Sequence, residues 1–89
     1  MIKKAKDERV KNLSKEERSI LIKFGKILKD RREEQELTLY GIEDQGYPSW
    51  QHWQKLESSL RDIKFTTIIK ICKTLRIQPS ELFDTIKVK

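Results

Sequence analysis

The chain has a single cysteine, Cys72, among its 89 residues, so it can form no internal disulfide bond. It also has no long run of apolar residues, which excludes a membrane span. Residues 1–13 are basic but lack the apolar stretch of a secretory signal. Free cysteine without disulfides suits a reducing compartment. These absences together favour a cytoplasmic protein that has no membrane as a partner.

Groups for catalysis or metal binding are also scarce. His52 is the only histidine and Cys72 lies on an apolar stripe, whereas a zinc site needs about four ligands. The sequence shows no glycine-rich phosphate loop, no nucleophile paired with a base, and no carboxylate pair on a credible cleft. It therefore predicts no catalytic residue, no metal site and no cofactor, and hence no enzyme.

Charge is what the chain has in abundance. It carries 20 basic and 14 acidic residues, a net charge of +6, and a basic balance favours polyanionic partners. Residues 37–60 hold one basic and three acidic residues, a net −2, whereas the segments before and after them each carry +4. If the protein binds phosphates, the basic flanks must therefore supply most of the contacts.

The apolar spacing predicts helices and no strand. Ser14 and Glu17 form a capping-box pattern, which predicts a helix over residues 15–34. Its apolar stripe has helical spacing and consists of Ile20, Leu21, Phe24, Ile27 and Leu28. Gly25 lies within this helix at a cost of about 1 kcal/mol against alanine, and close packing by a neighbouring helix would be one reason for it. Residues 1–14 form a charged extension ahead of the domain.

Two further helices are predicted near the C-terminus. The first covers residues 65–75 and has the apolar stripe Phe65, Ile68, Ile69, Cys72 and Leu75. A short last helix follows, with Pro79 just before it and Ser80 as its cap. We therefore expect one small all-α domain of five helices over residues 15–84, followed by a tail at residues 85–89.

Between these helices, residues 37–57 form a pattern of two short helices around a tight turn. Thr38 can cap the first helix, and Ile42 is the apolar residue on its inward face. Gly46-Tyr47-Pro48 ends that helix. Ser49 can cap the second, over residues 50–58. One face of that second helix carries Trp50, Trp53 and Leu56, and the other carries Gln51, Gln54, Lys55 and Ser58. A short helix of this kind can enter a DNA major groove.

A wider set of positions, in register from about residue 24 to residue 83, fits the pattern of one family. They are Gly25, Leu28, Arg32, Leu37, Thr38, Ser49, Trp53, Lys55, Leu56, Glu57, Ile68, Ile71, Leu75, Ile77, Glu81, Leu82 and Phe83. Through them the chain resembles the Cro/phage-repressor (XRE-type) helix-turn-helix domains. The resemblance implies a compact five-helix, lambda-repressor-like DNA-binding domain with its helix-turn-helix at about residues 38–58.

Four positions depart from the family pattern. Leu39 stands where a phosphate-binding Gln is common, and Glu43 replaces a small residue that lets the two short helices approach closely. The turn Gly46-Tyr47-Pro48 replaces a Leu-Gly-Val-like turn, and Arg31 replaces an apolar residue. These departures remove one expected phosphate contact and bear on the angle between the two short helices.

The candidate site residues follow from the pattern and the resemblance together. Gln51, Gln54 and Lys55 are the candidate base readers, because a Gln amide matches adenine N6 and N7 in the major groove. Candidates for the DNA backbone are Thr38, Ser49, His52, Arg61 and Lys64. The resemblance also implies a partly buried ion pair between Arg32 and Glu57.

The place of Trp50 is open, although Trp53 and Leu56 are expected in the core. Trp50 could pack on Tyr47 or on the first helix, or it could stack against a sugar-phosphate edge. Packing is the interpretation we favour.

Two functions fit the sequence. The first is a sequence-specific regulator of transcription, acting as a repressor, which binds double-stranded DNA as a homodimer through Phe83, Ile86 and Val88 or through the N-terminal extension. The second is an antitoxin or a protein-binding adaptor on the same fold, with weak or no independent DNA binding. The net −2 of residues 37–60, together with Glu43 and Leu39, favours the second.

Overall fold

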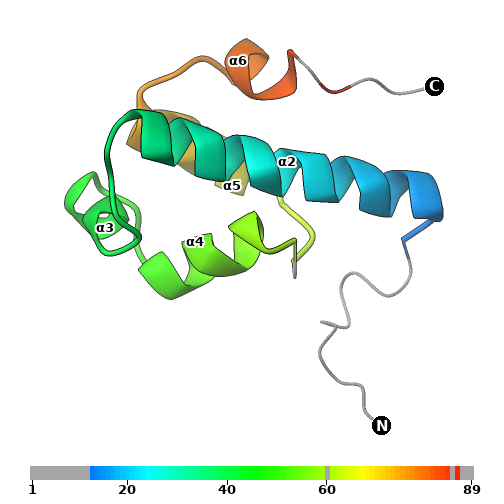
Figure 1. Ribbon diagram of the computed structural model, residues 1–89, viewed down its shortest axis with the longest axis horizontal. Coiled ribbons are helices and arrows are strands. Elements are labelled where there is room, and N and C mark those ends of the chain that lie inside the picture. Colours follow the sequence, from blue (N-terminus) through cyan, green and yellow to red (C-terminus); the bar gives the residue numbers. More distant parts are fainter. Residues whose placement is uncertain (1–12, 60, 85, 87–89) are drawn as a thin grey trace, which may run out of the picture.

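The computed structural model describes residues 13–59, 61–84 and 86, and over these residues it is all-helical (Figure 1). Its five helices are α2 (Lys15–Glu34), α3 (Gly41–Asp44), α4 (Trp50–Glu57), α5 (Phe65–Leu75) and α6 (Pro79–Phe83). In Figure 1 the long helix α2 runs across the molecule, with α4 on one side and α6 on the other. The all-α, five-helix prediction is confirmed for the described part of the chain.

Some predictions fall on other parts of the chain. Residues 1–12 of the charged extension, and residues 85 and 87–89 of the tail, lie outside the described residues. The proposed contact of Val88 therefore lies outside them too. Within the described residues, none of the helices combines the length and the apolar character that crossing a membrane requires.

Helix α2 begins and ends where the sequence predicts. The Ser14 hydroxyl accepts a hydrogen bond from the Glu17 N–H at 3.0 Å, and the Glu17 carboxylate accepts one from the Ser14 N–H at 3.0 Å. Together they satisfy two donors that the first turn of a helix otherwise leaves unpaired. The buried face of α2 consists of Leu21, Phe24, Gly25, Leu28 and Arg32.

Gly25 marks the closest approach of α2 to α4. A Cβ atom at this position would lie 2.5 Å from the carbonyl oxygen of Glu57 and 2.9 Å from that of Leu56. Both obstacles are backbone atoms, so no side-chain rotation relieves the clash. The close packing suggested as a reason for this glycine is therefore present, and the last turn of α4 is the partner.

The core lies where α2, α4, α5 and α6 meet. Its largest fully buried side chains are Trp53, Leu28, Ile42, Leu56, Ile71, Leu75 and Leu82. Because every helix contributes at least one of these residues, the short helices α3 and α6 are stabilised by packing rather than by their own length.

The predicted stripe of α5 is wrong at its start. Phe65 is 75% exposed, whereas Ile71 and Thr74 are buried. Phe65 is the first residue of the helix, where the packing neighbours have not yet begun to cover it. Thr74 tolerates burial because its hydroxyl donates to the Lys70 carbonyl at 2.8 Å, so its polar group is satisfied.

The predicted cap of α6 is also wrong. Pro79 is the first helical residue rather than the residue before the helix, and Gln78 is the cap instead of Ser80. The Glu81 carboxylate accepts a hydrogen bond from the Gln78 N–H at 2.9 Å. Proline suits the first helical position because the N–H that it lacks has no partner inside the helix.

Candidate nucleic-acid interface

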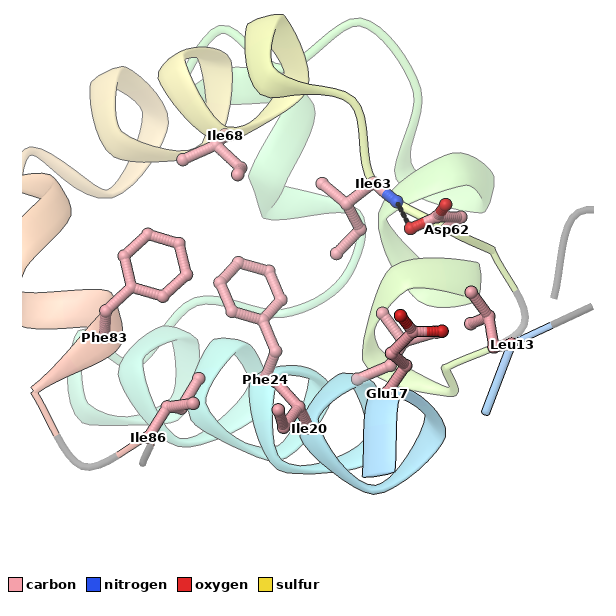
Figure 2. Close-up of a pocket in the computed structure, with 10 residues that line it drawn as sticks. Leu13, Glu17, Ile20, Phe24, Asp62, Ile63, Ile68, Phe83 and Ile86 are labelled. Carbon is pink, nitrogen blue, oxygen red and sulfur yellow. Dashed lines mark hydrogen bonds between the residues drawn. The ribbon is translucent and has the colours of Figure 1, made fainter. Parts of the chain in front are cut away.

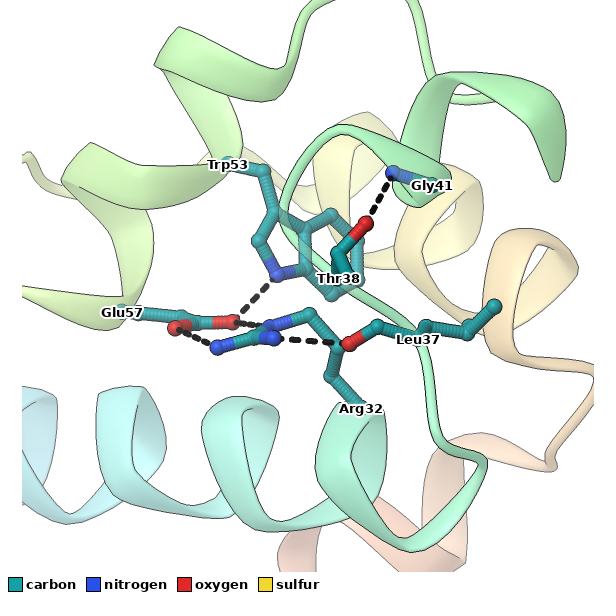
Figure 3. Close-up of polar contacts among 6 residues, drawn as sticks. All are labelled: Arg32, Leu37, Thr38, Gly41, Trp53 and Glu57. Atoms are coloured by element: carbon teal, nitrogen blue, oxygen red, sulfur yellow. Dashed lines mark hydrogen bonds and ion pairs between the residues drawn. The ribbon is translucent and has the colours of Figure 1, made fainter.

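A buried polar network fixes α4 against α2 (Figure 3). The Arg32 guanidinium donates through Nε to Glu57 Oε2 at 2.7 Å and through Nη2 to Oε1 at 3.1 Å. Its Nη1 donates to the Leu37 carbonyl at 2.8 Å, and the indole N–H of Trp53 donates to Glu57 Oε2 at 2.6 Å. The structure thus brings together the ion pair that the resemblance implies, and it adds an indole that the sequence did not indicate.

This network has the properties of a structural pair. The two charged side chains are only 9% and 8% exposed, and the carboxylate accepts three hydrogen bonds. The hydrogen bond that Arg32 donates to the Glu57 carboxylate raises the pKa of Arg32 despite the opposing effect of burial. Removing one partner would leave the other charge buried without compensation, at a cost of about 3–5 kcal/mol.

The first helix of the helix-turn-helix is shorter than expected. Thr38 accepts a hydrogen bond from the Gly41 N–H at 2.9 Å, but the regular helix α3 begins only at Gly41 and has four residues. Leu39 and Tyr40 form a turn that precedes it. Gly46 then has a φ of +110°, a conformation that glycine adopts without strain, and the chain turns toward α4.

The start of α4 is held by two side-chain oxygens. The Ser49 hydroxyl accepts a hydrogen bond from the His52 N–H at 3.2 Å, as expected of a cap. Glu43 Oε2 accepts another from the Trp50 N–H at 2.9 Å. Glu43, which stands where the family has a small residue, thus joins α3 to α4. Its carboxylate occupies a place that a phosphate could otherwise take at this helix terminus.

The outward face of α4 carries the three candidate base readers. Gln51, Gln54 and Lys55 are all exposed, whereas Trp53 and Leu56 on the inward face are 0% and 1% exposed. Gln51 already contacts its own helix cap, because its Oε1 accepts a hydrogen bond from the Ser49 hydroxyl at 3.2 Å. The structure therefore places these side chains together on one accessible surface of a firmly packed helix.

Trp50 packs on a partner that the sequence did not suggest. Its ring meets that of Tyr40 edge to face, with centroids 4.6 Å apart. The expected partners were Tyr47 or the first helix, but Tyr47 packs edge to face on Trp53 at 5.0 Å and is buried. An aromatic residue ten positions before Trp50 was the only signal in the sequence for the Tyr40 contact.

His52 is engaged with Tyr47. The Tyr47 hydroxyl lies 2.8 Å from His52 Nδ1, and the two rings stack with centroids 5.9 Å apart. Burial raises the pKa of Tyr47 to about 12, so its hydroxyl keeps its proton at neutral pH. The tautomer of the imidazole decides whether the hydroxyl or Nδ1 donates in this hydrogen bond.

Two of the candidate phosphate contacts lie between α4 and α5. Arg61 is half-buried, and Lys64 is exposed and directly precedes the first residue of α5. Arg31, another departure from the family pattern, donates to the Glu81 carbonyl at 3.4 Å and so connects α2 to α6. Among the described residues, no cluster of three or more His, Cys, Asp or Glu side chains could hold a metal ion.

One of three comparisons with known proteins gives a match. A search of curated proteins and a search of solved structures give no match. The family model of the Cro/C1-type HTH DNA-binding domain matches residues 49–87, which begin at the cap of α4 and include α5 and α6. Over these residues the chain is similar to the Cro/C1-type helix-turn-helix DNA-binding domain, and the family resemblance predicted from its sequence is confirmed.

Proposed function

We propose that this protein is a sequence-specific regulator of transcription that binds double-stranded DNA and represses by occupying it. The observation that carries the proposal is the division of α4 into a buried face and an exposed polar face. The similarity of this same segment to a DNA-binding domain supports it. The matched family consists of DNA-binding domains, which favours a role in the cytoplasm without catalysis.

In this proposal α4 lies in the major groove. Gln51 and Gln54 offer a donor and an acceptor on one amide, which fits the N6 and N7 atoms of adenine. Lys55 contacts guanine or a phosphate. All three side chains are exposed, and the backbone that carries them is fixed by the network around Glu57. Pre-positioned side chains lose less conformational freedom when they bind.

The phosphate contacts come from the ends of the short helices and from the loop after α4. The proposed residues are Thr38, Ser49, His52, Arg61 and Lys64. Arg61 and Lys64 supply the positive charge, since residues 37–60 carry a net −2. Contacts of this kind set the orientation of the protein on DNA and make its affinity depend on salt.

We propose a homodimer that binds two half-sites about 10 base pairs apart. An apolar groove of about 370 Å³ offers a surface for it (Figure 2), lined among others by Ile20, Ile63, Ile68, Phe83 and Ile86. Phe83 stacks on Phe24 at 5.5 Å and remains 41% exposed, so a second copy could cover it. Size exclusion with light scattering at tens of micromolar tests this, and a strict monomer both free and on a two-half-site duplex would exclude the dimer.

Selection from a random duplex library near 100 mM salt tests the function itself. We expect an enriched motif with two-fold symmetry. The double variant Gln51→Ala/Gln54→Ala should lose the motif and keep its thermal stability. The control Gln35→Ala removes an amide that donates to the Leu75 carbonyl of α5 at 2.7 Å, and it should keep the motif. Binding without an enriched sequence, lost at modest salt, would show non-specific contact only.

A second function, protein binding as an antitoxin or adaptor, is favoured by one observation. The Glu43 carboxylate accepts a hydrogen bond from the Trp50 N–H at the start of α4. In a DNA-binding helix a DNA phosphate can accept hydrogen bonds at this position instead. A toxin-like reading frame next to the gene would favour this function, and a stable complex of the two purified proteins would establish it.

A further inference from the structure

Two aromatic rings lie together at the start of α4, outside the core cluster. Tyr40, which precedes α3, and Trp50, the first residue of α4, meet edge to face at 4.6 Å. Tyr40 is 67% exposed, and Trp50 is partly exposed. Burial in the core therefore does not account for two large apolar side chains at this place.

The pair is held in a fixed arrangement by the backbone on both sides. The Thr38 hydroxyl accepts a hydrogen bond of 2.9 Å from the N–H of Gly41, the residue after Tyr40. The Glu43 carboxylate accepts the N–H of Trp50 at 2.9 Å. One ring comes from each side of the turn between the two short helices, so their separation is set before any ligand arrives.

The surroundings of the pair disfavour a phosphate as its partner. Glu43 places a carboxylate directly at the Trp50 N–H, and residues 37–60 carry a net −2. A neutral apolar group is therefore a better partner for these rings than a sugar-phosphate edge. In the major groove the apolar group is the 5-methyl of thymine.

We propose that the Tyr40–Trp50 pair contacts a thymine methyl group at the edge of each half-site. Gln51 follows Trp50 in the chain and is exposed, so the Trp50 ring and the first of the proposed base readers both belong to the first turn of α4. The pair would then read thymine by its methyl group, while Gln51 and Gln54 read adenine through hydrogen bonds. This inference rests on the proposed function.

The test uses the full chain and the duplex motif obtained by selection, with each thymine replaced singly by deoxyuridine, which lacks only the methyl group. We expect the wild type to bind about three- to fivefold more weakly when one particular thymine is replaced in one half-site, as for the loss of one buried methyl. Tyr40→Ala and Trp50→Ala should bind the thymine duplex more weakly and show no further loss with deoxyuridine. Such non-additivity identifies a direct contact.

Two further variants make the test specific. Tyr40→Phe keeps the ring and should keep the full response to deoxyuridine. Ile22 lies on α2 and is 55% exposed. Ile22→Ala removes this apolar side chain and should also keep the full response to deoxyuridine. Thermal melts of all variants exclude loss of folding as the cause.

Three outcomes would overturn the inference. Equal affinity for thymine and deoxyuridine at every position, with a motif that still depends on Gln51 and Gln54, overturns it and leaves the proposed function intact. Normal DNA binding by Tyr40→Ala and Trp50→Ala, with the response to deoxyuridine retained, overturns it and shows that another group contacts the methyl. The absence of any enriched motif overturns the proposed function and this inference together.

Discussion

The two faces of α4 differ in what holds them. The inward face is fixed by backbone contact at Gly25, by the buried Arg32–Glu57 pair and by Trp53. The outward face carries exposed side chains, among them Gln54 and Lys55. Under the proposed function, folding and recognition depend on separate residues of one eight-residue helix. Substitutions on the outward face should therefore leave the stability of the fold unchanged.

The largest effect is expected from the inward ion pair. Arg32→Ala leaves the Glu57 carboxylate buried without its cation and should lower the free energy of unfolding by about 3–5 kcal/mol. Chemical denaturation measures it. The neighbouring Arg31→Ala is the control. Arg31 pairs with an exposed Glu34 and donates one long hydrogen bond, 3.4 Å, to the Glu81 carbonyl, so its loss should cost no more than about 1 kcal/mol. Equal losses for the two variants would contradict the structural role of the pair.

Gly25→Ala should have the next largest effect. The added Cβ would lie 2.5 Å from the Glu57 carbonyl oxygen, so the two helices must move apart. We expect a loss of about 1–3 kcal/mol, as for overpacking of a core, even though alanine is the better helix former. Lys26→Ala, one residue further along on the exposed face, serves as the control. A Gly25→Ala variant more stable than the wild type would show that α2 and α4 are not in close contact.

In the loop after α4, Arg61→Ala should lower the affinity for DNA and leave the sequence preference unchanged. If Arg61 contacts a phosphate, its loss weakens binding to all duplexes about equally and lowers the salt slope by about one. Titrations at several salt concentrations measure both quantities. A changed motif with an unchanged slope would mean that Arg61 reads bases instead.

The smallest effect is expected at Tyr47, in the turn that precedes α4. Tyr47→Phe removes the hydroxyl that lies 2.8 Å from His52 Nδ1 and should cost about 0.5–1.5 kcal/mol. Burial raises the pKa of Tyr47 from its ordinary 10.0 to about 12, so the folded state favours the protonated hydroxyl. The contribution of the protonated Tyr47 hydroxyl to the free energy of unfolding is complete below pH 10 and is lost as the pH rises toward 12. Unfolding measured across that range should show a steeper loss for the wild type than for Tyr47→Phe, and parallel curves would contradict the assignment.

The parts of the fold that local sequence signals define were predictable. The capping box at Ser14 and Glu17 set the start of α2, and Ser49 set the start of α4. Gly25 could be explained in advance as a contact point because glycine within a helix is costly unless packing requires it. These features depend on residues close together in the chain, or on one residue whose cost is known.

The predictions that failed depend on how a residue packs against other elements of the fold. Phe65 fits the apolar stripe of α5, but it lies beyond the reach of the packing helices and is exposed. The Trp50 ring meets Tyr40 because the fold brings the turn before α3 against the start of α4. Glu43 was noted only as an obstacle to packing, whereas its carboxylate holds the start of α4. Periodicity within one helix contains no information about these contacts.

The separation of the two faces of α4 is tested most directly by one experiment on the double variant Gln51→Ala/Gln54→Ala. The measurement is selection from a random duplex library, compared with the wild type and accompanied by a thermal melt of each protein. The account predicts a lost or altered motif at an unchanged melting temperature. An unchanged motif, or a motif lost only together with the fold, would contradict it.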